Sequence, residues 1–536
     1  MGDRMIPVSF EELLEQVLNE YHNKKTLFQV PVKENTKRIP VGPAAGPHTQ
    51  LAENIVAAYA AGAMYFELKT VQVLYGKDLG IKKPCIYAGH EVFNTEWSSE
   101  LSAEEAANEY IKAFLLIRVL RKELNLKRSP MPKFILSVGY DLKGIQSKPV
   151  DCFLNQMQDA TQTQEWNNDI AYLKAHKNQF QNLTSEDIEE INSNAKISDT
   201  VTLSTMHGCP AAEIEQIAVY LMEKKHFNTL VKLNPTLIGK QKTREILQKK
   251  GYGDFSYSEE DFDKNLSMDD AVELIKHCKQ KAVSLKKTFG VKMTNTFPVF
   301  SNGKMQDEKM YLSGVALYPL AMEAAAELAK RLPGDITMSY SGGADTYNIT
   351  ELLETGMCPI TISSVLLKPK GYQNINRMIE KAEISYHPKE HIDVACLTQL
   401  SKKAWDDKYY DKKETTRYPF RENYSITCAK CNNCVDVCPN RANIRIETQE
   451  ESYVLHRNRL CNECGCCSFH CIMGHEPYLE KLTIYEDEGE YQNEDKKRAT
   501  VLYTEKEKRL HIDGKEVPIP QELEQILKEG KKRGAF

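Results

Sequence analysis

Two copies of one cysteine pattern lie near the C-terminal end of the sequence. Each copy has the spacing Cys-x2-Cys-x2-Cys-x3-Cys, and a proline follows the last cysteine of the first copy. The eight residues are Cys428, Cys431, Cys434, Cys438, Cys461, Cys464, Cys467 and Cys471. In proteins with this spacing, three thiolates of one copy and the fourth thiolate of the other hold each [4Fe–4S] cluster. We therefore expect two clusters that carry single electrons, with Cys471 completing the first set and Cys438 the second.

Paired cysteines also bind zinc, which is the alternative for this segment. A zinc site needs only four ligands, so zinc does not account for four evenly spaced cysteines in each of two copies. The remaining cysteines of the chain are scattered and indicate no disulfide framework. This pattern favours a reducing compartment, and we expect the protein to be cytoplasmic.

A further cysteine, Cys209, lies in the segment Ser-Thr-Met-His-Gly-Cys-Pro, between an apolar run and a predicted helix. A lone cysteine is usually a small core residue, but the flanking glycine and proline favour exposure and a catalytic role. The helix N-terminus should lower its pKa toward the thiolate, whereas proton donation needs the thiol. Burial would oppose that lowering. His207 is either a proton shuttle or a cap of the loop.

Small and polar residues also lie within or directly after several apolar runs. They are Ala44, Ala45, Gly46, Lys69, Thr70, Lys232, Asn295, Thr296, Gly342, Gly343, Ser363 and Ser364. A lysine within an apolar strand is costly unless it is paired, so Lys69 and Lys232 indicate an anionic ligand. Glycines and hydroxyls after the last two runs are typical of a phosphate site. FMN would account for all of these residues together, although tight turns and internal salt bridges could explain each one singly.

The elements that position these residues follow from eight apolar runs separated by helical stretches. The runs are 39–42, 64–68, 134–138, 201–205, 229–233, 291–294, 336–339 and 361–365. This alternation predicts an α/β fold, a (β/α)8 barrel within residues 1–385 that begins with an amphipathic helix. Helix signals support the spacing: a capping box at Ser102 and Glu105, and glycines where helices should stop, at Gly62 and Gly356. The polar stretches 143–199 and 240–272 are expected to be insertions above the barrel.

Beyond the barrel we expect a polar linker at 386–425 and a two-cluster domain at 426–475. Residues 476–536 are highly charged, with a short apolar run at 499–503 and a helical segment at 521–531. This extension is either a solvated packing segment or a surface that docks a partner.

Composition limits the possible partners. The chain has 536 residues, a net charge of −5 and a pI of about 6.3, so it offers no basic surface for nucleic acid. Its N-terminal stretch is acidic and lacks the apolar centre of a signal peptide, and no apolar run approaches membrane-spanning length. We expect a soluble protein that binds neither nucleic acid nor membranes.

Several segments resemble the dihydroorotate dehydrogenase class, and more closely the FMN domain of dihydropyrimidine dehydrogenase. These are GPAAG, the Lys69-Thr70 pair, HGCPAAEIE, VKLNPT, TNT, SGVALYPLAM and SGGAD, followed by the two-cluster segment. In order and content they are most similar to the selenate reductase subunit family, over about residues 1 to 475. The resemblance implies that FMN is held by Ala44, Ala45, Lys69, Lys232, Asn295, Gly314, Gly343 and Ser364. We expect the neighbouring residues Gly46, Thr70, Thr294, Gly342 and Ser363 to bind it as well. The resemblance also implies that Cys209 gives a proton to the substrate carbon opposite the hydride from flavin N5.

Two departures from the pyrimidine enzyme matter. Its substrate pocket uses several asparagines, whereas here the candidate substrate-binding residues are Asn94, Asp141, Asn295 and Thr296, which present a different donor and acceptor pattern. No glycine-rich dinucleotide fingerprint is present between a strand and a helix. Electrons should therefore come from a separate FAD and NAD(P)H flavoprotein subunit, which would make the protein part of a hetero-oligomer.

The sequence thus predicts an FMN and iron–sulfur reductase subunit acting on a C=C or C=N bond of a heterocycle. A purine derivative such as urate is favoured over a pyrimidine. An electron-transfer subunit of a molybdenum or selenate reductase, with no substrate of its own, is the alternative. A purely structural barrel is disfavoured because it leaves the strand lysines and the glycine-rich phosphate site unexplained.

Overall fold

The computed structural model describes most of the chain. The described residues are 5–34, 37–95, 99–126, 130–204, 208–332, 336–414, 428–448, 452–491, 499–532 and 536. His207, a candidate catalytic residue, lies outside the described residues. None of the helices described is long and apolar enough to cross a membrane.

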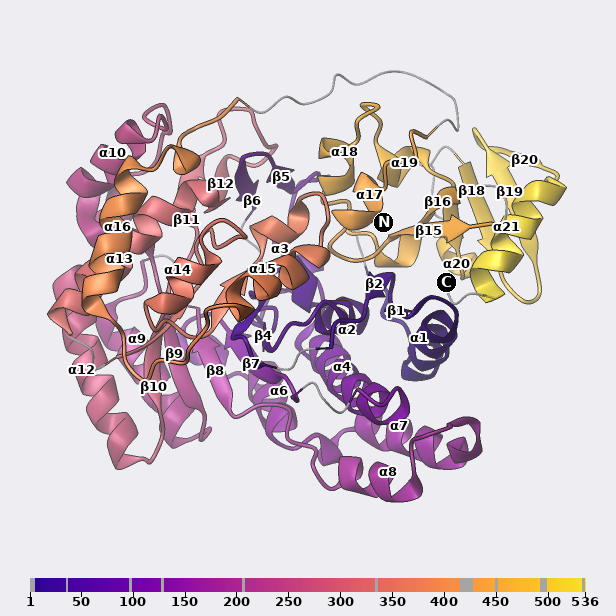
Figure 1. The fold of residues 1–536 in the computed structure, drawn as a ribbon, viewed down its shortest axis with the longest axis horizontal. Helices are drawn as coiled ribbons and strands as arrows, with labels where there is room; N and C mark the ends of the chain where they lie inside the picture. Colours follow the sequence, from indigo (N-terminus) through magenta and orange to yellow (C-terminus); the bar gives the residue numbers. More distant parts are fainter. Residues whose placement is uncertain are drawn as a thin grey trace.

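Eight parallel strands form the centre of the fold (Figure 1). In chain order they are β3 (Val41–Pro43), β4 (Tyr65–Glu67), β7 (Lys133–Val138), β8 (Thr200–Leu203), β9 (Asn228–Leu233), β10 (Phe289–Met293), β13 (Thr337–Tyr340) and β14 (Ile360–Ile362). Neighbours in the chain are neighbours in the sheet, and β14 pairs with β3. The backbone N–H of Met64 donates to the carbonyl oxygen of Val41 at 3.0 Å and closes the ring. The predicted barrel is confirmed, and each predicted run overlaps one strand.

Helices pack around this ring. They include α2 (Ala52–Ala60), α3 (Gly76–Leu79), α4 (Ala103–Glu123), α9 (Ala211–Glu223), α10 (Gly239–Lys249), α12 (Met268–Ser284), α13 (Tyr318–Arg331), α14 (Ile349–Glu354) and α15 (Gln373–Glu383). The predicted helix ends are confirmed at two places. Ser102 and Glu105 form the capping box of α4, and Gly62, with φ of 101°, follows α2. The predicted N-terminal helix is α1 (Phe10–Lys24), which leads into the hairpin β1 (Thr26–Leu27) and β2 (Val30–Pro31).

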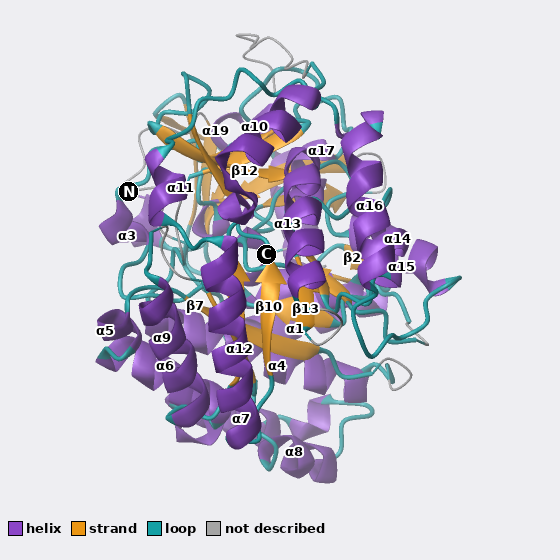
Figure 2. Cartoon of the chain, turned by 90° about the vertical axis from the view of Figure 1, so that its left-hand side faces the viewer, coloured by secondary structure: helices purple, strands orange, loops and turns teal. Residues whose placement is uncertain are grey.

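The insertion at 143–199 was expected above the barrel, but most of it does not lie there (Figure 2). It forms α5 (Leu142–Ile145), α6 (Lys148–Gln158), α7 (Gln164–Ala175) and α8 (Ser185–Asn192). The carboxylate of Glu123, the last residue of α4, accepts backbone N–H bonds from residues 181–183. In Figure 2 the arrow of β10 points away from α7 and α8. Helix α6 packs its apolar face against α4 and leads the chain back to the opposite end of the barrel. By contrast, α11 (Glu260–Lys264), from the second insertion, lies at the barrel mouth, as expected.

A small antiparallel sheet lies at the barrel mouth and was not predicted. This cap sheet contains, in spatial order, β11 (Phe297–Phe300), β12 (Lys309–Gly314), β6 (Glu91–Asn94) and β5 (Ile86–Ala88). Its two halves follow β4 and β10, more than 200 residues apart, and Asn94 faces Tyr311 in register. The cap sheet therefore adds walls to the cavity described below.

A six-stranded sheet lies at the right of Figure 1. Its strands are β15 (Asn443–Glu447), β16 (Ser452–Arg457), β17 (Thr483–Tyr485), β18 (Ala499–Tyr503), β19 (Lys508–Ile512) and β20 (Lys515–Val517). Short helices occur in the same part of the chain: α17 (Asn433–Asp436), α18 (Cys466–Phe469), α19 (Pro477–Glu480) and α20 (Glu488–Tyr491). A longer helix, α21 (Gln521–Lys532), follows the last strand. Strands from the cysteine segment and from the charged extension thus share one sheet.

The segment expected to be a polar linker contains a packed helix. This is α16 (Val394–Asp406), and its residues Leu397, Leu400 and Ala404 are buried. It packs along α13 on the outside of the barrel. An apolar stripe with helical spacing, rather than the overall polarity of the segment, decides its structure.

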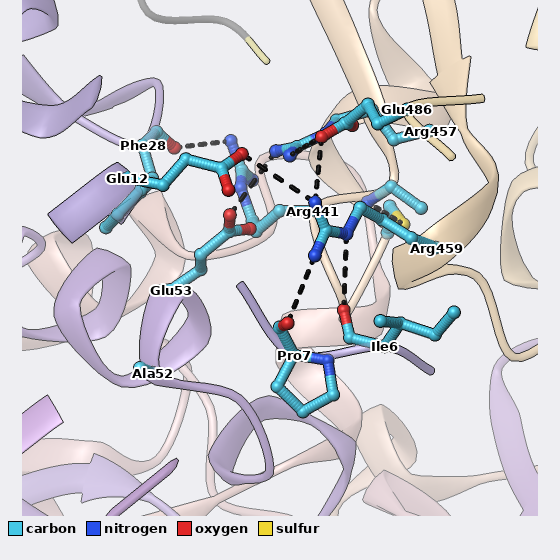
Figure 3. A network of polar contacts seen from close by, with 12 residues as sticks. Ile6, Pro7, Glu12, Phe28, Ala52, Glu53, Arg441, Arg457, Arg459 and Glu486 are labelled. Atoms are coloured by element: carbon cyan, nitrogen blue, oxygen red, sulfur yellow. Dashed lines mark hydrogen bonds and ion pairs between the residues drawn. The ribbon is translucent and has the colours of Figure 1, made fainter. Parts of the chain in front are cut away.

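A buried ion network fixes the C-terminal sheet to the barrel side (Figure 3). Arg457 is 1% exposed and pairs with Glu53 of α2 at 3.3 Å and with Glu486 at 3.0 Å. Arg459 pairs with Glu486 at 2.9 Å and donates to the carbonyl oxygen of Ile6. Because a buried charge is tolerated only with partners, this network favours one arrangement of the sheet on the barrel.

Candidate functional site

A cavity of about 710 Å³ opens at the carboxyl ends of the barrel strands. Functional groups of such barrels gather at this end. All thirteen residues expected to hold FMN line it: Ala44, Ala45, Gly46, Lys69, Thr70, Lys232, Thr294, Asn295, Gly314, Gly342, Gly343, Ser363 and Ser364. The structure thus brings together residues that are more than 300 positions apart in the chain.

One side of the cavity is built from close backbone approaches. Gly343 has a φ of 84°, and a Cβ atom there would lie 2.4 Å from the carbonyl oxygen of Gly314. A Cβ on Gly46 would lie 2.8 Å from Ser363 Oγ. Only glycine fits the first position, since a side chain would meet fixed backbone. Together with Ser364, which begins a short 3-10 helix, these residues fit a phosphate group.

Two lysines line this cavity: Lys232 lies on β9, and Lys69 follows the end of β4 by two residues. Burial lowers the pKa of Lys232 to about 8, and Glu67 only partly opposes the effect. Burial likewise lowers the pKa of Lys69 to about 8, although the carboxylate of Glu100 raises it. An anion bound between these lysines would favour their charged forms. The two positions therefore fit the anionic ligand that the sequence predicts.

A carboxylate and a third lysine lie below the cavity floor, and neither was predicted from the sequence. Glu67 of β4 and Lys292 of β10 form an ion pair, and both are almost completely buried. Lys292 Nζ also donates to Thr361 Oγ1 at 2.6 Å. A charged residue inside an apolar strand is costly, and this criterion selected Lys69 and Lys232. The same criterion applies to Glu67 and Lys292, so it could have identified them from the sequence.

The candidate substrate-binding residues divide into two groups. Asn94, Asn295 and Thr296 line the cavity. Asp141 does not: its side chain accepts the backbone N–H of Gly144 at 2.7 Å and caps α5. A short polar side chain before a helix is usually a cap, and that local role decides the position of Asp141. Gln72 and Tyr140 also line the cavity, and the sequence analysis did not select them.

Cys209 precedes α9 by two residues and lies beside the mouth, outside the cavity lining. Gly208, its neighbour, donates its N–H to Asn265 Oδ1 at 2.9 Å. Burial raises the pKa of Cys209 to about 11, and the hydrogen-bonded carboxylate of Glu213 and the charge of Asp141 add to the rise. The thiolate expected from the helix N-terminus is therefore disfavoured, mainly because the thiol is partly buried and also because two carboxylates lie near it. A thiol can serve as a proton donor.

The second set of cysteines surrounds a small internal cavity. Cys438, Cys461, Cys464 and Cys467 line it, and each is less than a tenth exposed. Three come from the second copy of the motif and one from the first, which is the grouping expected for a shared pair of clusters. We call these four residues the inner set.

The other four cysteines also gather in one place. Burial raises the pKa of Cys434 to about 12, and the neighbouring thiols of Cys428, Cys431 and Cys471 add to the rise. Cys431 is exposed, and Cys428 and Cys471 are half-buried. We call these four residues the outer set. Among the residues that the structure describes, no three His, Cys, Asp or Glu side chains form a site for a single metal ion.

The inner set adjoins the barrel cavity at two junctions. Ile86 of the cap sheet lines the cavity, and its backbone N–H donates to the carbonyl oxygen of Cys464 at 3.0 Å. On the other side, the hydroxyl of Tyr372 donates to the carbonyl oxygen of Pro439 at 2.8 Å. The ring of Tyr372 contacts that of His48, which follows the cavity residue Pro47. The cysteine segment thus packs directly on the walls of the cavity.

Comparisons with known proteins place this architecture among oxidoreductases. The model of the family described as "Oxidoreductase YgfK, N-terminal TIM-barrel domain" matches residues 15–412. Proteins of Escherichia coli strains K12 and O157:H7, both described as "Putative oxidoreductase YgfK", are 39% identical over 471 residues. The matched region is 82% of this chain and 45% of each relative, so the chain spans less than half the length of these curated relatives.

Solved structures of DHODH from Eimeria tenella were also found. The complex with ferulenol has a TM-score of 0.38 and 14% sequence identity, and the match covers 64% of this chain and 80% of that one. The ligand-free form has a TM-score of 0.38 and 12% identity, with 70% and 98% of the two chains covered.

Proposed function

Because the chain belongs to the YgfK oxidoreductase family, we propose that it uses FMN and two [4Fe–4S] clusters to reduce a heterocycle. One observation carries the proposal. The cavity at the barrel mouth is lined by every residue expected to hold FMN, and its wall at Ile86 is hydrogen-bonded to Cys464 of the inner cysteine set. The proposed flavin site and the proposed iron–sulfur site would therefore be adjacent in one polypeptide.

Bound FMN would supply a hydride and exchange single electrons with the clusters. The chain supplies the surroundings. Gly314, Gly343 and Ser364 would hold the phosphate, because their backbone and hydroxyl groups allow close approach. Lys69 and Lys232 would balance the negative charge of the ring, because both line the cavity.

Cys209 is the proposed proton donor for the substrate. Its raised pKa keeps the proton on sulfur at neutral pH, as general-acid chemistry requires. Glu213 accepts the backbone N–H of Leu142 at 3.1 Å and hydrogen-bonds the thiol. We assign Glu213 to holding the thiol in place; His207 remains a proposed shuttle.

The outer set would receive electrons and the inner set would pass them on. Cys431 is exposed, whereas the inner set is buried against the cavity wall. A partner subunit can therefore approach the outer set more closely than the inner one. We propose that this partner is a flavoprotein with FAD and NAD(P)H sites, that the two form a hetero-oligomer, and that they work in the cytoplasm.

The proposed substrate has a C=C or C=N bond in an electron-poor ring, and a purine derivative such as urate is favoured. Asn94 and Asn295 provide amides at the cavity, where a lactam edge presents both donors and acceptors. The side-chain oxygen of Asn295 accepts the N–H of Thr296 at 3.0 Å, which leaves its NH₂ group to donate. An open cavity supports a chain with its own substrate over a pure electron-transfer subunit.

The test is anaerobic reconstitution with FMN, a soluble iron salt and sulfide, followed by reduction with dithionite. Reduced protein is then mixed with urate, xanthine, uracil or thymine, and reoxidation is followed by the flavin absorbance. The proposal expects reoxidation by one of these rings and a much slower rate for Cys209→Ala. If Cys209→Ala were reoxidised as fast as the unmodified protein, Cys209 would not be the proton donor. A protein that binds neither FMN nor iron would contradict the whole proposal.

A further inference from the structure

The ion pair below the cavity floor is tied to the cavity lining. The side chains of Glu67 and Lys292 are 1% and 2% exposed. Glu67 accepts the backbone N–H of Ala45 at 3.3 Å, and Lys292 donates to Thr361 Oγ1 at 2.6 Å. Ala45 and Thr361 both line the cavity, whereas the pair itself does not. The charges thus lie immediately behind two residues that would face a bound ring.

Lys232 shares the same carboxylate. It lies on β9 opposite Lys292 in the parallel register, so the two lysines are direct neighbours. The charge of Glu67 acts on both lysines, but only Lys292 forms the ion pair. The second oxygen of Glu67, Oε1, is buried and has no hydrogen-bond partner among the described residues. Glu67 could therefore take Lys232 as a partner if Lys292 were absent.

We infer that Glu67 and Lys292 are positioning residues for the flavin ring, and that Lys292 keeps Lys232 directed into the cavity by occupying Glu67. This inference rests on the proposed function. A buried carboxylate pairs with an available ammonium group, because an unpaired buried charge is costly. With Lys292 present, that partner comes from below the floor, and the Lys232 ammonium is left for the ligand.

The test uses flavin-stripped protein and a fluorescence titration with FMN. Lys292→Met should weaken FMN binding by about tenfold, the loss expected for one charge-assisted hydrogen bond, because Lys232 turns to Glu67. The double variant Glu67→Gln/Lys292→Met removes the competing carboxylate. It should bind FMN several-fold more tightly than Lys292→Met alone. Such a recovery is a coupling between sites that a purely structural defect does not produce.

A second buried pair provides the matched control. Glu109 and Lys112 of α4 form an ion pair with 2% and 5% exposed side chains, outside the cavity lining. Lys112→Met should lower the thermal unfolding temperature and leave FMN affinity unchanged. Unfolding temperatures of all variants are measured without flavin, to separate folding from binding.

Two outcomes would overturn the inference. One is unchanged FMN affinity in Lys292→Met. The other is a double variant that binds as weakly as Lys292→Met, which would make the loss a packing defect. Failure of the unmodified protein to bind FMN would instead contradict the proposed function, so the two failures are distinguishable.

Discussion

Ile86 lines the barrel cavity while its backbone N–H donates a hydrogen bond to the carbonyl oxygen of Cys464, 3.0 Å away. The cavity and the inner cysteine set therefore meet across one strand of the cap sheet. Gly465, the next residue, packs so closely that a Cβ atom would lie 2.6 Å from Cβ of Pro84. The cysteine segment therefore packs tightly against the stretch of chain that leads into β5.

Gly465→Ala should therefore destabilise the protein and lower its iron content. The substitution combines a φ of 87° with a clash against Pro84, and overpacking of this kind costs about 1–3 kcal/mol. Urea unfolding and iron analysis measure the two effects. Gly514→Ala is the control, because Gly514 has a φ of 75° but a Cβ atom there would meet no described atom within 4 Å. Equal effects of the two substitutions would show that the close contact is unimportant.

Glu213→Gln should lower the pH at which Cys209 reacts with iodoacetamide. Burial is the larger cause of the raised pKa, but the Glu213 carboxylate adds to it. Removing that charge lowers the pKa, so the thiolate forms at a lower pH. Mass spectrometry of alkylated Cys209 over a pH series gives the midpoint. Glu215→Gln, which changes a carboxylate 3.5 Å from His277, should leave it unchanged. If the midpoint pH of Cys209 alkylation did not change in Glu213→Gln, the contact between Glu213 and Cys209 would be contradicted.

FMN affinity should fall as the pH rises through about 8. Burial lowers the pKa of both Lys69 and Lys232 to about 8. Below that pH the free protein presents ammonium groups to an anion; above it they lose their protons, and binding must restore them. Lys232→Met should weaken binding and flatten the dependence on pH in fluorescence titrations. Lys250→Met should preserve the dependence, because Lys250 is buried beside Asp411 outside the cavity lining. Affinity that rises with pH would be contrary to this assignment.

Arg457→Met should lower the free energy of unfolding by about 3–5 kcal/mol, the usual loss when one member of a buried ion pair is removed. Burial opposes ionisation of Glu486, but Arg457 and Arg459 outweigh it and lower its pKa to about 2. Without Arg457 a buried carboxylate loses its main partner. Urea denaturation measures the change. Arg244→Met removes an exposed pair and should cost at most about 1 kcal/mol. Similar losses in the two variants would contradict the role of the network.

The barrel could be predicted because its strands are short apolar runs bounded by small or polar residues, and each run can be recognised alone. The cap sheet could not be predicted, since β6 and β12 pair across more than 200 residues and neither strand specifies its partner locally. Its register, with Asn94 opposite Tyr311, depends on the closed barrel that brings both segments to one end.

In the candidate site, too, local sequence signals could be predicted and long-range contacts could not. The cysteine spacing and the lysines are local signals, and the structure gathers them as expected. Asp141 was wrongly predicted to bind the substrate. Its side chain caps α5 instead and does not line the cavity. The environment of Cys209 depends on Glu213 and Asp141 together, and Asp141 comes from a segment 68 residues earlier. Such long-range electrostatics leave no pattern in the sequence.

The shared C-terminal sheet has a practical consequence for anyone trimming the chain. In β16, His456 and Arg457 pair with Thr483 and Ile484 of β17. Cutting after residue 475 would remove β17 and strip one edge of β16 of its backbone partners. Exposed edges of this kind recruit strands from other molecules, so the shortened protein should aggregate even though every cluster cysteine is retained.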